Sequence, residues 1–198
     1  MQPAIRVVAG SPSQSILGNK RIYAGLGDLL EAHPSEISLE TYRASADFRG
    51  ALAQDRSALV TLVVCHGYRL DGHLAELSWG REQISTPLAA PIHSNAVIFN
   101  VCFAAKPDGS PADLVRSAVE GRAWLGGTGI VQRSHVTWFA EELVKLIGAG
   151  RRSELEDPHD ALHVLEEISA VLQPRRDRHL PKAPEVKWNG IWGTPRFV

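Results

Sequence analysis

The sequences ALVTLVVC at residues 58–65 and AVIFNVCF at residues 96–103 are the two strongest strand signals in the chain. Both are almost entirely apolar and rich in β-branched residues. Runs of this kind are typical of strands that are covered on both faces, as in a parallel sheet. We therefore predict that these two stretches are central strands of one sheet.

Shorter segments around them alternate between strand and helix patterns. Strands are predicted at 4–9, 37–42 and 123–125, a hairpin at 74–84, and helices at 25–33, 45–53, 111–120, 134–147 and 154–172, the last interrupted at Asp157-Pro158. This alternation predicts an α/β sandwich with a mostly parallel central sheet flanked by helices. We expect residues 1–198 to form a single domain, which 151–198 complete as a helix, a loop and a terminal strand.

Composition restricts the class of protein without naming a partner. The chain has 198 residues, enough for one domain with a buried core, and a formal net charge of −1. A balanced charge gives no electrostatic indication of a nucleic-acid or membrane partner. No apolar run approaches the ~20 residues that span a bilayer, and no signal peptide is recognised. With two cysteines a disulfide framework is excluded, so we expect a reducing, cytoplasmic location.

Two residues that can carry chemistry follow the two strongest strands. His66 and Gly67 end the first strand, and Cys102 lies at the end of the second. Ligands of open α/β sheets bind outside the carboxyl ends of strands, so these side chains can meet there. An imidazole can take the proton of a thiol and later protonate a leaving amine. The backbone N–H groups of Gly67 and Cys102 can then form an oxyanion hole.

Other interpretations of these residues remain open. A single apolar-flanked cysteine is often buried and inert, and strand alternation points Cys65 to the face opposite His66. A metal site would draw on Cys65, His66, His73 and Cys102. Zinc sites usually show closely spaced ligand pairs such as Cys-x2-Cys, which this chain lacks. We therefore predict neither a metal nor another cofactor.

Three stretches together resemble the caspase-like superfamily of cysteine peptidases, most closely its bacterial CHAT-type branch. Residues 62–67 (LVVCHG) resemble the strand that ends in the catalytic His-Gly of that family. Residues 97–105 (VIFNVCFAA) resemble the strand that ends in its nucleophilic cysteine, and 123–147 resemble the following strand, glycine turn and long helix. The resemblance implies a caspase-like three-layer sandwich over the whole domain.

The resemblance also implies an activity, that of a cysteine endopeptidase with Cys102 as nucleophile and His66 as general acid and base. Asn100, Tyr68 and Asp71 are the candidates for shaping the pocket of the residue before the scissile bond. Metacaspase-like members hold a basic side chain there with an aspartate two residues before the nucleophile. Because Asn100 stands at that position here, aspartate or arginine specificity does not carry over.

Family members often serve in regulated protein cleavage, including antiviral defence and cell death. The resemblance therefore implies a bacterial protein with a protein substrate, activated by a partner protein, by processing or by self-association. Two alternatives remain, a catalytically silent binding or scaffold module and a cysteine hydrolase of non-peptide amides or esters. On the peptidase interpretation, His66→Ala abolishes activity and Cys65→Ser leaves it largely intact.

Overall fold

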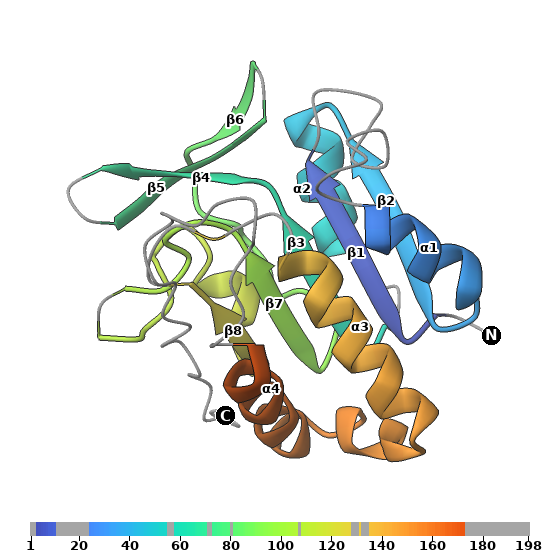
Figure 1. Ribbon diagram of the computed structural model, residues 1–198. Coiled ribbons are helices and arrows are strands. Elements are labelled where there is room, and N and C mark those ends of the chain that lie inside the picture. Colours follow the sequence, from blue (N-terminus) through green and yellow to red (C-terminus); the bar gives the residue numbers. More distant parts are fainter. Residues whose placement is uncertain are drawn as a thin grey trace, which may run out of the picture.

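A sheet of five parallel strands forms the centre of the protein in a computed structural model (Figure 1). The structure describes residues 3–10, 24–54, 58–70, 73–79, 81–106, 108–127, 131 and 135–172. In chain order the strands are β1 (Ile5–Gly10), β2 (Ile37–Tyr42), β3 (Val60–Val64), β7 (Ala96–Asn100) and β8 (Ala123–Gly126). Their spatial order is β2-β1-β3-β7-β8, and each neighbouring pair is parallel.

The two strands expected at the centre of the sheet are neighbours there. Every residue of β3 and of β7 is buried, which accounts for their almost purely apolar sequences. The predicted α/β class with a mostly parallel sheet is confirmed.

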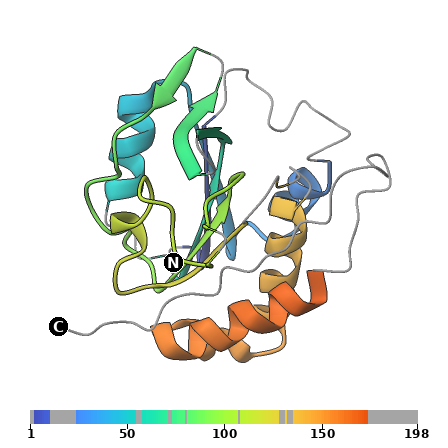
Figure 2. The same cartoon turned by 90° about the vertical axis from the view of Figure 1, so that its left-hand side faces the viewer.

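Helices lie on both faces of this sheet (Figure 2). Helices α1 (Ala24–Ala32), α3 (His135–Gly148) and α4 (Pro158–Leu172) pack with alternate strand residues in one core cluster. Helix α2 (Ser45–Ala53) packs with the remaining strand residues in a second cluster on the opposite face. The arrangement is compatible with a three-layer sandwich. Below, the two sides are called the α3 face and the α2 face.

A small antiparallel sheet follows β3 directly. It contains β4 (His66–Leu70), β5 (His73–Trp79) and β6 (Glu82–Ile84), in that spatial order. The predicted hairpin corresponds to β5 and β6. The first strong strand ends just before His66 as predicted, but a new strand, β4, begins at His66, since only Cys65 separates β3 from β4. The chain therefore leaves one sheet and enters the other at the candidate catalytic histidine.

The predicted helix at 111–120 is absent. Pro111 pairs with Ala105 in an isolated β-bridge, and the segment continues as turns with a short 3-10 helix at Ser117–Val119. Carbonyl groups of this segment accept hydrogen bonds from a distant loop, Leu114 from Leu88 N–H and Ala118 from Ile92 N–H. These long-range bonds replace the regular pattern that a helix needs.

The expected interruption near Pro158 is confirmed. A 3-10 helix, η2 (Arg151–Leu155), precedes α4, which begins at Pro158. Asp157 Oδ1 accepts a hydrogen bond of 2.8 Å from His159 N–H, and proline is favoured at a first helical position. The loop and strand predicted at 174–184 and 186–198 lie outside the described residues. Within the part of the chain described, no helix has the length and apolar character needed to cross a membrane.

Candidate active site

The adjacent strands β3 and β7 end just before His66 and Cys102 respectively. Each residue of β3 lies next to the residue 36 positions later in β7, as Val64 lies next to Asn100. His66 and Cys102 are also 36 positions apart. Both follow the carboxyl ends of adjacent parallel strands, where ligands of such sheets bind. Both residues therefore belong to the carboxyl edge of the central sheet.

Gly67 packs directly on the backbone of Cys102. A Cβ atom at Gly67 would overlap the Cys102 carbonyl oxygen, and it would lie 2.8 Å from Leu74 Cδ1 and 2.9 Å from Val101 Cγ1. Real Cβ atoms do not approach so closely, so this position accepts only glycine without a shift of the backbone. The contact brings the His66-Gly67 dipeptide against the segment that carries the cysteine.

The Cys102 thiol is partly buried and lies against the core cluster of the α3 face. Val131 N–H donates a hydrogen bond of 3.3 Å to Sγ, and the thiol can donate to Val131 O at 3.8 Å. These two contacts fix the position of the Cys102 sulfur against the backbone of Val131. Helix α3 begins at His135, four residues after Val131, so the positive end of its dipole belongs to the same edge.

The residue after the cysteine has an unusual backbone conformation. Phe103 has φ of 60°, and it is the one non-glycine residue with positive φ in the described part of the chain. For an aromatic residue this conformation is strained by about 1–3 kcal/mol, and such strain concentrates at functional sites. The Arg69 guanidinium lies over the Phe103 ring, 5.5 Å from its centroid. A cation–π contact therefore connects β4 to the strained turn.

Cys65 lies on the other side of the sheet from Cys102. It packs against the core cluster of the α2 face, as strand alternation predicts. Burial raises the pKa of the Cys65 thiol, and the negative charge of a Cys102 thiolate raises it further. Cys65 is therefore a neutral thiol at physiological pH, a poor nucleophile and a poor metal ligand. In the described part of the chain, no three His, Cys, Asp or Glu side chains are placed to hold a metal ion.

On the peptidase interpretation, Cys65→Ser is expected to change the rate of peptide cleavage by no more than about twofold, because a neutral buried thiol does not act as nucleophile.

In Cys102→Ala protein, Cys65 should stay unlabelled by iodoacetamide at pH 9, although an ordinary cysteine, with a pKa of about 8.5, is mostly thiolate there. Burial holds the pKa of Cys65 above that pH. Peptide mapping by mass spectrometry measures the label. Equal loss of activity from Cys65→Ser and Cys102→Ser, with zinc bound, would support a metal site instead.

The three predicted substrate-binding residues have different positions. Asn100 is buried at the end of β7, and its register places it on the face of Cys102. No described residue gives a hydrogen bond to Asn100 Oδ1. Tyr68 lies on β4 with 59% of its surface exposed. Asp71 lies outside the described residues.

Sequence reasoning missed three residues of this site, namely Arg69, Phe103 and Val131. A phenylalanine gives no signal of a left-handed backbone, and the pairing of Arg69 with Phe103 depends on the fold of β4. Val131 is 29 residues from Cys102, and no pattern in the sequence connects them.

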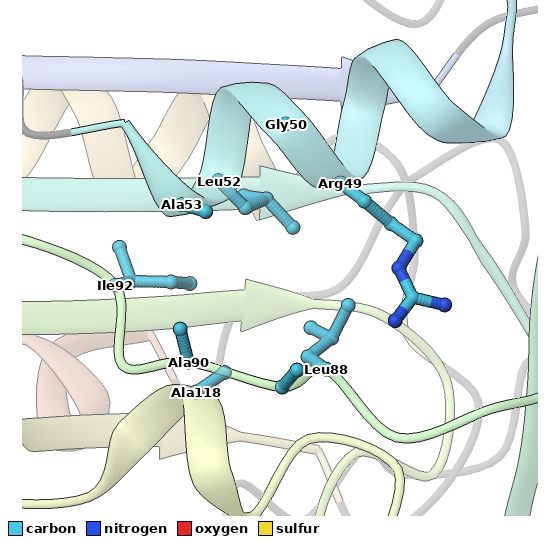
Figure 3. A pocket seen from close by; sticks show the side chains of 9 residues that line it. Arg49, Gly50, Leu52, Ala53, Leu88, Ala90, Ile92 and Ala118 are labelled. Carbon is cyan, nitrogen blue, oxygen red and sulfur yellow. The ribbon is translucent and has the colours of Figure 1, made fainter.

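An apolar pocket of about 270 Å³ lies away from this site (Figure 3). It is enclosed by α2, the loop that includes Leu88 and Ile92, and Ala118. The lining residues Leu52, Leu88 and Ile92 belong to the core cluster of the α2 face, whereas Cys102 contacts the α3 face. The pocket is therefore separate from the Cys102 thiol.

No protein-family model matches the chain, and no curated protein matches it. The arrangement of its own residues is therefore the basis for inferring its function.

Proposed function

We propose that the protein is a cysteine endopeptidase in which Cys102 and His66 form the catalytic dyad. The observation that carries the proposal is the packing of Gly67 on the Cys102 backbone. This contact brings the residue after His66 against the Cys102 backbone at the carboxyl edge of the sheet, which supports the dyad that the resemblance to caspase-like peptidases implies. The strained Phe103 and the hydrogen bond from Val131 to Sγ support a functional role for Cys102.

In the proposed reaction, His66 accepts the proton of Cys102, and Sγ attacks the carbonyl carbon of the scissile peptide bond. The carbonyl oxygen becomes an oxyanion that accepts hydrogen bonds from the N–H groups of Gly67 and Cys102. When the C–N bond breaks, the protonated imidazole gives its proton to the leaving amine and a thioester remains. Water, deprotonated by His66, then hydrolyses the thioester and regenerates the thiol.

The exposure of His66 fits this role. Its side chain lies at the surface at the start of β4, whereas Cys102 is partly buried below. Catalytic hydrogen bonds are often long without substrate and tighten only when substrate binds.

Labelling with a peptidyl chloromethyl ketone tests the proposal. The reagent alkylates an accessible thiol much faster when a peptide-binding site positions it next to the sulfur, so we expect rapid labelling of Cys102 and none of the buried Cys65. A denatured sample is the control, because both thiols then react equally. A peptide library should be cut by the native protein and left intact by Cys102→Ala.

The other functions make different predictions for the same experiment. A silent scaffold leaves Cys102 unlabelled and every peptide intact, and Cys102→Ala then behaves as wild type in cells. A hydrolase of non-peptide amides or esters is labelled at Cys102 by a simple acylating ester but cleaves no peptide. Either result would overturn the endopeptidase assignment.

The wider role belongs to the same proposal. We place the protein among caspase-like peptidases of bacteria, acting in the cytoplasm on protein substrates in regulated cleavage such as defence or cell death. Activation by a protein partner, by processing or by self-association is part of this proposal.

A further inference from the structure

Exposed apolar side chains gather next to the candidate histidine. Three large hydrophobic residues are strongly exposed among those described, namely Tyr68 at 59%, Leu70 at 66% and Val171 at 49%. Two of the three lie on β4, which begins at His66. Solvation of apolar surface is unfavourable, so such clustering on one strand indicates a surface that binds another molecule.

Tyr68 and Leu70 lie on the same face of β4 as His66. Gly67 and Arg69 lie on the side of β4 that carries Leu77 and Leu74 of the α2-face core, although the Arg69 side chain is itself exposed. Alternation then directs His66, Tyr68 and Leu70 outward. The register shift between β4 and β5 leaves this alternation intact, because the extra residue, Ala75, lies on β5. A continuous row about 13 Å long therefore runs from the candidate histidine along β4.

The edge of β4 offers backbone groups as well. β4 is an outer strand of its sheet, paired on one side with β5, and no described strand lies on its other side. Outer strands of soluble proteins usually carry charged side chains or proline, which prevent pairing with other chains. On β4 the outward positions 68 and 70 carry apolar side chains instead. An extended peptide can add to such an edge through backbone hydrogen bonds, with its alternate side chains contacting the row.

A negative charge next to this row favours some peptide sequences over others. Glu76 lies opposite Tyr68 on the outward face. No described residue forms an ion pair with its carboxylate. A basic side chain of a bound peptide can supply the missing opposite charge, whereas an acidic one is repelled.

We propose that the outward face and edge of β4, from His66 to Leu70, hold the substrate as an extended peptide with apolar residues at alternate positions and a basic residue among them. This inference rests on the proposed function, because it makes the row an extension of the cleavage site. The molecule proposed to bind this surface is the substrate chain. A second copy of this protein is the alternative, and the experiment below detects it.

The test measures binding without cleavage, in Cys102→Ala protein. The probe is a fluorescent ten-residue peptide with Leu and Phe at alternate positions and one Lys between them, and fluorescence anisotropy gives its Kd. We expect Tyr68→Ser combined with Leu70→Ser to raise this Kd about 10- to 30-fold, since about half of each side chain is left to be buried by the peptide. Val171→Ser is the matched control, an exposed apolar residue on α4, and should leave the Kd unchanged.

Other outcomes overturn the inference or the function separately. The docking surface is wrong if the parent protein binds no peptide, if the double variant binds as the parent does, or if Val171→Ser weakens binding equally. It is also wrong if light scattering shows a dimer that the double variant abolishes while no peptide binds. If the peptide binds as expected but wild-type protein cleaves none and Cys102 stays unlabelled, the docking surface stands and the endopeptidase assignment fails.

Discussion

His66→Ala is expected to reduce the rate of peptide cleavage by a factor of about 100 to 10,000, the usual contribution of a general acid and base. In the proposed reaction the imidazole both activates the Cys102 thiol and protonates the leaving amine, so its removal affects two steps. The His66 side chain is exposed, and truncation of an exposed side chain changes the free energy of unfolding by less than about 0.5 kcal/mol. Steady-state kinetics with a cleaved peptide and thermal unfolding together measure the two effects.

His93→Ala is the matched control for this prediction. His93 is also exposed, but it precedes β7 and so belongs to the amino edge of the sheet, opposite Cys102. Its removal should leave the cleavage rate unchanged. An equal loss from both variants, or full activity of His66→Ala, would show that the dyad is assigned incorrectly.

Gly67→Ala is expected to disrupt the site through the backbone, with the imidazole and the thiol both present. The added Cβ would overlap the Cys102 carbonyl oxygen, and a backbone atom cannot move aside as a flexible side chain can. Relief requires β4 or the Cys102 segment to shift, which costs about 1–3 kcal/mol of stability. The shift also misplaces a predicted oxyanion donor, and loss of one such donor lowers the rate about 100- to 1,000-fold. Denaturant unfolding and the cleavage rate are the measurements.

Gly50→Ala separates this effect from a general response to the same substitution. Gly50 lies in α2, and nothing approaches within 4 Å of a Cβ placed there. Alanine is favoured over glycine inside a helix by about 0.5–1 kcal/mol, so this variant should be slightly more stable and fully active. Normal stability and activity in Gly67→Ala would contradict the close contact between Gly67 and Cys102.

Local sequence patterns determined most of the secondary structure. The predicted elements at 37–42 and 45–53 have the observed bounds, and the helix expected at 134–147 is α3, displaced by one residue. These segments succeed because a strand or helix with one buried side imposes its own period on the sequence. The segment 111–120 has a helical pattern, yet its carbonyl groups bond to a loop more than 20 residues away. No local pattern carries that information.

By itself, the sequence determined the fold class and the pair of residues to examine, His66 and Cys102, because two buried parallel strands require continuous apolar runs and reactive residues at their ends stand out. Only the tertiary structure decided that β3 and β7 are adjacent with a register of 36, and that β4 starts at His66. It also decided that Gly67 packs on the Cys102 backbone, that Val131 N–H bonds the Cys102 sulfur, and that Phe103 has a positive φ. Contacts of this kind depend on how separate strands and loops pack, and packing is a property of the folded chain as a whole.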